Sequence, residues 1–487
     1  MCKPSVEDHV ALLHQNVPRS DNGSPIVKRS SDVDLEQQIK RRAEMPKGER
    51  LAGALPFLVV TFLCAFQAGL VFGWAPFATM LEAEGVYASK CPATEPSCDA
   101  RIVGFSFIYS LGTAALAFGG LPVGILLDLP RFGPVFCSAM GGLLVGGGLL
   151  AIAFLPADAL DGDAFVPAFV ALGFGGILSF FTAMKAAAIF PKRKATILIA
   201  VSCSMHTSAV IPLIFFELME HFSLRRSLVI GVYGALVLAS FAIWTHLWRT
   251  FSKFLDTPST SAPPSKPSEA NGKAPTNGSH IALSRRKYGI QSVPPHTSTL
   301  EVLRSPQFVC GCVWFVCSQW HGNTYLGESK YMLAALGDKE GDYMQIFSIF
   351  LGTALLTLPV LSCAESKLGP TGQMQLVSIL ALVHALCALV PWLPGQIVTF
   401  AVFTLLRTSI YSTAGIFVAS TFGFGRMGLV YGLMQFAGAL SNLTIAPVAS
   451  WILDDSGRDG DWTPLFCLWI ALAVGQFAMI EWLARKV

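Results

Sequence analysis

Apolar runs of about twenty residues recur along most of this sequence, and no other feature limits its fold so strongly. A helix needs roughly 20 apolar residues to cross the hydrocarbon core of a bilayer. Hydrophobic residues fill 53% of the 487 positions and charged residues only 13%, whereas about a quarter of the residues in a soluble protein are charged. The sequence therefore predicts an all-α membrane protein with many spanning helices.

Twelve such runs are predicted, six on each side of a long polar stretch. We place them at 52–78, 101–126, 133–155, 164–190, 195–218, 227–248, 307–335, 343–363, 372–392, 396–420, 428–453 and 463–484. The polar stretch at 249–303 is rich in Pro, Ser and Asn, which predicts a disordered linker. We accordingly expect a disordered tail at 1–50, a six-helix half at 51–248, the linker at 249–303 and a second six-helix half at 304–487.

Basic and acidic residues alternate from loop to loop, and this alternation predicts the orientation of the chain. Basic clusters occur at 40–50, 192–194 and 285–287, and the opposite loops are acidic at 82–84, 158–163 and 454–455. Because cytosolic loops carry an excess of Lys and Arg, we expect both termini and the linker on the cytosolic side. Arg225 and Arg226 are an exception, since they lie in an opposite loop.

Cysteine placement separates one pair from the rest. Cys91 and Cys98 lie in the polar loop YASKCPATEPSCDAR, where a disulfide could form if the loop faces an oxidising compartment; the sequence leaves the bonded and the free form open. Most other cysteines lie inside apolar runs and are expected to be small packing residues. No spacing of Cys and His typical of a metal site occurs, so no metal or cofactor is expected. The basic loops lack the interleaved aromatic residues of a nucleic-acid interface.

The two predicted halves resemble each other. LPVGILLDLPRFGP at 121–134 corresponds to LPVLSCAESKLGP at 358–370, each with an acid, then a base, then Gly-Pro. The acids are Asp128 and Glu365, and the bases are Arg131 and Lys367. Parallel duplication of six spans is the arrangement of the major facilitator fold, which binds its substrate between the halves near the middle of the membrane.

Specific stretches carry a family resemblance. GILLDLPRFGP resembles the loop 2–3 motif of the major facilitator superfamily, in which an acid and a base latch the cytosolic ends of helices. That resemblance implies a gating role for Asp128, Arg131, Glu365 and Lys367. Five further stretches resemble solute carrier family 43: AGLVFGWAPF (68–77), GGILSFFTAMKAAAIFPKRKATI (175–197), QWHGNTYLGESKYML (319–333), LLRTSIYSTAGIF (405–417) and FGFGRMGLVYGLMQFAGALSNL (422–443).

Family 43 includes facilitators of large neutral amino acids and an equilibrative nucleobase transporter, and apicomplexan amino acid transporters are similar to it. The resemblance therefore implies transport of an amino acid or a nucleobase. One position departs from the family pattern, because its members usually have Asp in the middle of span 5, where this chain has His206 in SCSMHTSA. This departure puts the transfer of substrate identity in doubt.

Arg407 is the most unusual residue for its position, near the middle of the predicted span 396–420. Ionisable groups at this depth are costly and usually face a cavity or a partner. A guanidinium presents a planar fork that suits a carboxylate. Arg407, with Tyr411 beside it, is therefore expected to bind a substrate carboxylate, or else to form a permanent ion pair with Glu328.

The segment 319–333 is unusually polar for a spanning helix. Gln319, Asn323 and Lys330 have spacings that place them on one side, and His321, Tyr325 and Glu328 on a neighbouring side. The spacing thus predicts one continuous polar sector lining an aqueous path. Residues from Gln319 to Tyr325 are expected to contact substrate, and Glu328 and Lys330 to form an outer gate, to pair with another helix or to lie in water.

Gln67 is expected to contact substrate, because spans 1 and 7 both line the cavity in this fold. His206 and Gln435 are weaker candidates, and each could equally make an interhelical hydrogen bond. His384 is expected to be structural.

The favoured hypothesis is a monomeric carrier that moves an amino acid by alternating access. Facilitated diffusion is preferred over proton symport, because spans 1, 4 and 10 contain no buried acid; Glu328 is one of the few candidates for coupling. A nucleobase carrier and a non-transporting receptor are the alternatives. No constellation typical of an enzyme occurs. The plasma membrane is favoured, although DHVALL at 8–13 fits an acidic dileucine motif for endolysosomal or vacuolar sorting.

Overall fold

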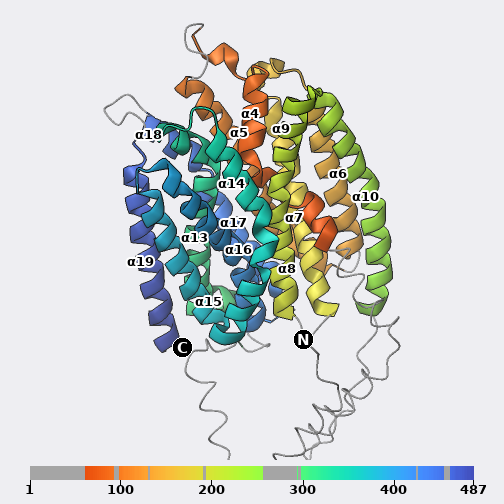
Figure 1. Ribbon diagram of the computed structural model, residues 1–487. Helices are drawn as coiled ribbons and strands as arrows, with labels where there is room; N and C mark the ends of the chain where they lie inside the picture. Colours follow the sequence, from red (N-terminus) through yellow and green to blue (C-terminus); the bar gives the residue numbers. More distant parts are fainter. Residues whose placement is uncertain are drawn as a thin grey trace, which may run out of the picture. The chain divides into compact units, whose positions relative to one another are not determined.

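The computed structural model describes residues 61–92, 98–129, 132–189, 194–255, 293, 298–423, 426–453 and 461–486. These residues form helices and connecting loops within one compact unit, Phe57–Val487, in which the helices lie side by side (Figure 1). The regular structure of the described residues is entirely helical, as predicted. The predicted tail at 1–50 and most of the predicted linker lie outside the described residues.

The first predicted half contains helical segments up to Leu255. In chain order these are 61–67, η1 (Leu70–Phe72), α4 (Trp74–Ala83), η2 (Ala88–Lys90), α5 (Asp99–Asp128), α6 (Gly133–Phe154), η3 (Ala159–Gly162), α7 (Phe165–Ile189), α8 (Lys194–Thr207), η5 (Ser208–Val210), α9 (Ile211–Phe222) and α10 (Arg226–Leu255). Pro134 and Pro212 lie in the first turns of α6 and α9, where the missing N–H group costs no helical hydrogen bond.

A well-capped pair of helices leads into the second predicted half. The first of them lies in the predicted linker, which is therefore helical at 299–303, as it is at 249–255 in α10, rather than disordered. Ser298 and Glu301 form a capping box at the start of the first helix, and Ser305 Oγ accepts from the Phe308 N–H at the start of the second. In chain order the segments are α12 (Thr299–Arg304), α13 (Pro306–Ala335), α14 (Asp342–Gly352), η6 (Thr353–Thr357), α15 (Leu358–Ala388), η7 (Leu393–Gly395), α16 (Gln396–Thr421), α17 (Met427–Asn442), α18 (Ile445–Leu453) and α19 (Thr463–Lys486).

Nine stretches of the described helices are long and apolar enough to cross a membrane, and the chain is an integral multi-pass membrane protein. One of these stretches, Asp342–Ala388, covers two predicted spans. The backbone leaves the helical conformation within it at Gly369, where φ is +66°, just before Pro370. The polar helix α13 and the interrupted segment at 61–83 are not among the nine, and the number of twelve spans stays a prediction.

The two ends of the helix bundle differ in the loops that they carry. The disulfide end carries the loop in which Cys91 and Cys98 are bonded to each other, and the linker end is the opposite end, where α10 stops and α12 starts. At the disulfide end Arg226 lies 3.2 Å from a carboxylate oxygen of Glu84 and also donates to the Leu155 carbonyl. This local pairing explains how a basic residue is accommodated among acidic loops.

Two helices are broken at the same depth, and the breaks pack against each other. The 3-10 segment η1 interrupts the first helix, and η5 interrupts the helix formed by α8 and α9. The Gly69 N–H donates to Ser208 Oγ at 2.8 Å, and a Cβ atom at Gly69 would lie only 2.0 Å from the Met205 carbonyl oxygen. A side chain at position 69 would therefore force the two segments apart. The breaks bring Phe72 close to His206 in the middle of the bundle.

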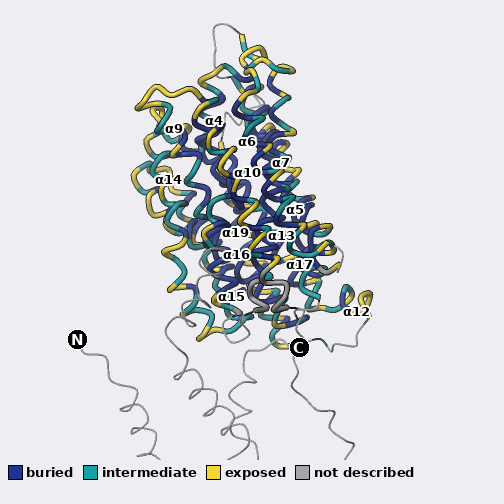
Figure 2. Tube along the Cα trace, turned by 90° about the vertical axis from the view of Figure 1, so that its right-hand side faces the viewer, coloured by how far each residue is buried: buried dark blue, intermediate teal, exposed yellow. Residues whose placement is uncertain are grey.

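The two halves contact each other through several helix pairs, chiefly α5 with α17 and α8 with α16 and α15. Near the linker end, a Cβ atom at Gly124 of α5 would lie 2.3 Å from the Gly428 carbonyl oxygen of α17. Buried residues follow the middle of the bundle along its length (dark blue in Figure 2), whereas exposed residues lie mainly on its outside. The polar residues of α13 from Ser318 to Ser329 therefore lie deep inside protein, whereas Lys330 is partly exposed.

Candidate functional site

Arg407 of α16 occupies the centre of the interface between the halves. Its side chain is 1% exposed, and its guanidinium lies 4.3 Å from the ring centre of Phe72 and 5.0 Å from that of Tyr411. None of its three side-chain nitrogens has a hydrogen-bond partner among the described residues. A buried charge is costly unless it is paired and hydrogen-bonded. Arg407 therefore presents three nitrogens, which carry five N–H donors, without a partner at the interface.

The expected alternative, a permanent ion pair between Arg407 and Glu328, is not formed in this structure. Glu328 is fully buried, and one of its oxygens accepts from Ser106 Oγ on α5 at 3.1 Å. Its other oxygen has no partner among the described residues. Glu328 thus joins α13 to α5 by a hydrogen bond to a neutral side chain and leaves the Arg407 guanidinium unpaired.

Aromatic rings from both halves frame Arg407. Phe72 and His206 come from the two broken helices of the first half, and Tyr411 comes from α16 of the second. The His206 ring centre lies 5.1 Å from that of Tyr411 and 5.6 Å from that of Phe72. His206 Nε2 is buried without a hydrogen-bond partner in the described structure. The structure thus brings together three predicted site residues, Arg407, Tyr411 and His206.

Two pairs of side-chain amides connect α13 with α17 beside this frame. Gln319 Nε2 donates to Gln435 Oε1 at 3.1 Å and lies 3.4 Å from the Tyr411 hydroxyl. Asn323 Nδ2 donates to Asn442 Oδ1 at 2.9 Å. Each pair keeps one buried carbonyl oxygen and one buried amide nitrogen without a partner among the described residues.

His321 and Tyr325 lie elsewhere than predicted. His321 Nε2 is 2.9 Å from His384 Nδ1, and its ring stacks on Trp469 with centres 4.2 Å apart. The Tyr325 ring packs against His384 and Phe403, at 4.4 and 4.8 Å. Both side chains therefore belong to the interior of the second half, among α15, α16 and α19. The prediction of one continuous polar sector is wrong, because neighbouring polar faces of α13 contact different helices.

Gln67 also lies inside one half rather than between the two. Its Nε2 donates to Ser179 Oγ of α7 at 3.1 Å, and its Oε1 accepts from Ser240 Oγ of α10 at 3.4 Å. Both ends of the amide are thus used within the first half, as expected of an interhelical hydrogen bond.

Gln67→Leu is expected to destabilise the protein without altering ligand affinity. A buried side chain left without its hydrogen-bond partner costs about 1–3 kcal/mol, and Ser179 and Ser240 would both lose theirs. The measurement is the melting temperature of the purified chain together with the dissociation constant of its ligand. A drop in melting temperature with affinity kept within about twofold is expected, and a large loss of affinity at unchanged stability would restore Gln67 as a substrate contact.

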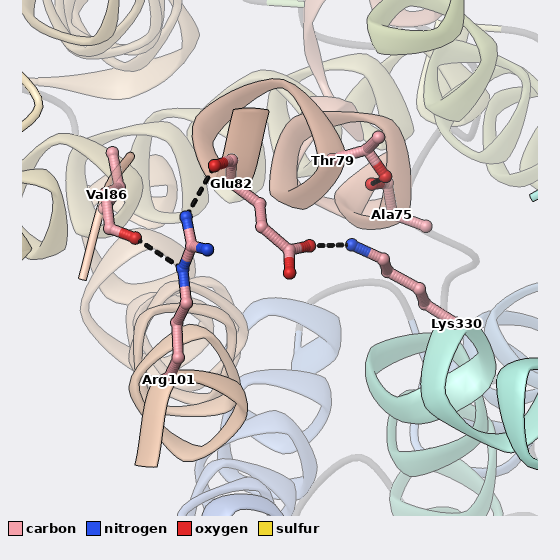
Figure 3. Close-up of polar contacts among 6 residues, drawn as sticks. All are labelled: Ala75, Thr79, Glu82, Val86, Arg101 and Lys330. Carbon is pink, nitrogen blue, oxygen red and sulfur yellow. Dashed lines mark hydrogen bonds and ion pairs between the residues drawn. The ribbon is translucent and has the colours of Figure 1, made fainter. Parts of the chain in front are cut away.

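Three polar contacts join the halves toward the disulfide end. Lys330 of α13 forms an ion pair with Glu82 of α4 (Figure 3). The Tyr109 hydroxyl of α5 donates to the Asn323 carbonyl oxygen at 2.9 Å, and the third contact is that of Ser106 with Glu328. Lys330 therefore holds the outermost of the three contacts between the halves at this end.

The structure describes only part of the four residues predicted to form a latch at the linker end. The Asp128 side chain and Arg131 lie outside the described residues. Glu365 is half-buried and Lys367 is exposed, and neither forms an ion pair within the described part of the chain. The linker-end latch implied by the repeat thus stays a prediction.

Sequence reasoning missed Phe72, Ser106 and Tyr109. Phe72 looks like any apolar residue, and only the broken helix brings its ring against the Arg407 guanidinium. Ser106 and Tyr109 are three positions apart in an apolar run, so they share a face of α5. That spacing is the signal by which the two could have been found.

Comparisons with known proteins identify the kind of protein. No family model matches the sequence. Equilibrative nucleobase transporter 1 of Bos taurus is 24% identical over 464 residues, which cover 82% of this chain and 90% of that protein. Large neutral amino acids transporter small subunit 3 of Homo sapiens is 29% identical over 159 residues, which cover 30% of this chain and 28% of that protein.

A solved structure shares the fold. A mutant peptide transporter of the POT type superposes with a TM-score of 0.55 at 13% identity, over 88% of this chain and 95% of that one. At this identity the similarity bears on fold alone. Together with the apolar helices and the similar transporters, it shows that the chain is an integral membrane transporter with the major facilitator fold, whose sequence resembles solute carrier family 43.

Proposed function

We propose that this chain carries an amino acid across the membrane by alternating access and that Arg407 binds the carboxylate of the solute. The observation that supports this proposal most strongly is the buried, unpaired guanidinium at the interface of the halves. Substrate sites of this fold lie between the halves near the middle of the membrane.

The buried charge of Arg407 favours a solute with a carboxylate. Removing a charge from water costs several kcal/mol per ion, and only a well-placed opposite charge offsets this cost. A carboxylate can accept two parallel hydrogen bonds from a guanidinium. A carboxylate-bearing solute would therefore supply the countercharge that the described residues do not, and its ammonium could donate to the free Oδ1 of Asn323.

A nucleobase is the second candidate, and a specific observation favours it. The relative that aligns with most of this chain is a nucleobase transporter, and the aromatic frame with its amide pairs could hold a flat, polar ring. A neutral base could accept hydrogen bonds from Arg407, but it would leave the buried positive charge without a countercharge. We therefore rank the amino acid first.

The mode of transport proposed is facilitated diffusion by a monomer, with both termini in the cytosol and the plasma membrane as the favoured location. In such a cycle the polar contacts at the disulfide end would separate while α5 and α17 stay packed near the linker end, and the reverse would then follow. Proton-coupled symport is the alternative mode, for which the buried Glu328 is the candidate group.

A ligand screen on the purified full-length chain tests the substrate class. Ligand at about 100 times its dissociation constant adds about 2.7 kcal/mol to the stability of the folded state, which is enough to raise the melting temperature by a few degrees. We expect such a rise with at least one of the protein amino acids. If nucleobases alone raise the melting temperature, the second candidate replaces the first.

A further inference from the structure

A cavity lies between the halves at the disulfide end, and Arg407 is not among its lining residues. Its volume is about 330 Å³, within the range of small-molecule sites. The first half contributes residues from α4 and α9, and the second contributes residues from α13, α14 and the loop between them. Apolar walls come from Pro76, Leu213, Phe216 and Met344. A solute approaching the central site from this end would pass this cavity.

Lys330 and Glu82 are the charged pair in the wall of this cavity. They bond to each other across the two halves, and their side chains are 24% and 21% exposed (Figure 3). A partly exposed ion pair contributes little to stability, because water screens the two charges. A solute that offers each of the two groups a new partner can therefore displace the pair at little cost.

Arg101 fixes the backbone of Glu82 near the end of α4. Arg101 of α5 donates from Nε to the Val86 carbonyl at 2.9 Å and from a guanidinium nitrogen to the Glu82 carbonyl (Figure 3). The backbone at Glu82 is thus fixed to α5, and the carboxylate can change partner without movement of the helix end. Arg101 is a positioning residue in this arrangement.

Two further acids line the cavity; Glu340 is exposed, and Asp338 is already engaged. The Asp338 carboxylate accepts from the backbone N–H groups of Tyr343 and Met344, at 3.3 and 3.1 Å. It therefore caps the start of α14. Among the cavity residues, Glu82 is consequently the acid that pairs with Lys330, and it is also the acid positioned to bind a cation that enters the cavity.

We propose that this cavity is a second, weaker binding site for a zwitterionic solute, at which the solute carboxylate replaces Glu82 on Lys330 and the solute ammonium binds Glu82. One ion pair between the halves becomes two ion pairs to the solute, so net charge is conserved. The solute thereby breaks the outermost contact between the halves before it reaches Arg407. The buried contacts of Tyr109 and Ser106 are untouched by this exchange.

This proposal rests on the proposed function, since it names the same solute class at an earlier point of the route. It also predicts which solutes can bind at this site. A nucleobase has no charge to offer either group, and a simple carboxylate or amine can satisfy only one of them. Only a zwitterion replaces both halves of the ion pair.

Equilibrium binding to the purified full-length chain tests the proposal. The probe is whichever amino acid gives the largest stabilisation in the ligand screen, in radiolabelled form. We expect two sites in the wild type, one weak site in Arg407→Gln, and one tight site in Lys330→Gln or Glu82→Gln. An unchanged dissociation constant of the tight site in those last two variants shows that they are folded. Lys339→Gln, at the exposed rim of the same cavity, is the matched control and should keep both sites.

Analogues of the probe test the class of ligand at the weak site in Arg407→Gln. We expect the des-amino acid and the decarboxylated amine each to bind at least about tenfold more weakly than the amino acid, because each loses one ion pair. Equal binding of the des-amino acid, or of acetate or chloride, would reduce the site to an anion site and overturn the proposal. Loss of all binding in Arg407→Gln would overturn it while leaving the proposed function intact. Absence of any amino acid response in the wild type would overturn both.

Discussion

Arg407→Gln is expected to lower amino acid uptake by the reconstituted protein by roughly 30-fold to 3,000-fold, without destabilising the ligand-free protein. Removal of one partner of a buried charge pair costs about 2–5 kcal/mol, and each 1.4 kcal/mol corresponds to a factor of ten. The pair in question forms only when the solute is bound, because the guanidinium has no partner among the described residues in its absence. The measurements are initial rates of uptake into proteoliposomes and the melting temperature without ligand.

The melting temperature separates the two roles that Arg407 could have, a structural role and a binding role. A residue that held the fold together would lower the melting temperature when replaced, whereas removal of a buried unpaired charge should leave it unchanged or raise it. Arg407→Lys is the matched control, since it keeps the charge and loses the planar fork. An intermediate loss of uptake is expected for it. A fall of several degrees in the melting temperature of Arg407→Gln would contradict the binding role.

Gly124→Val is expected to abolish most transport while leaving ligand binding in place. A Cβ atom at this position would lie 2.3 Å from the Gly428 carbonyl oxygen and 2.7 Å from its carbonyl carbon, so α5 and α17 could not approach as closely near the linker end. Overpacking of this kind costs about 1–3 kcal/mol. Only the conformation in which α5 and α17 touch is destabilised. Since each 1.4 kcal/mol corresponds to a factor of ten, uptake at saturating solute should fall by about 5-fold to 140-fold.

The matched control for this variant is Gly147→Val in α6, where an added Cβ atom would meet nothing within 4 Å. That variant carries the same change of helix propensity and should transport normally. The dissociation constant of the solute for Gly124→Val separates a defect in closing from a defect in binding. Normal transport by Gly124→Val would show that the cycle does not require this close contact between the halves.

Much of the architecture could be predicted from the sequence, because the membrane restricts what long apolar runs can become. The all-helical fold and the superfamily followed from those runs and from the repeated motifs. Helix ends followed local chemistry, as at Ser298 and Ser305, whose side chains cap α12 and α13. The breaks at η1 and η5 were not predicted, since each depends on the close approach of the other segment.

The candidate site was predictable only in part. Arg407 was found because a charge in the middle of an apolar run has few explanations, and the structure places Tyr411 and His206 beside it. The assignment of His321 and Tyr325 failed for a different reason. Their spacing was read correctly as one face of a helix, but that face contacts His384 and Trp469 rather than the other half.

The sequence by itself thus determined that this chain is a helical membrane protein and that Arg407 and the polar segment at 319–333 are exceptional, and it predicts that the two halves are related. Only the tertiary structure decided which helix each polar side chain meets. The spacing of residues fixes their angle about the axis of α13, but the identity of the neighbour at each angle depends on how all the helices pack. For that reason Gln319 and Asn323 contact α17, His321 contacts α15, and Lys330 bonds to Glu82 of the opposite half.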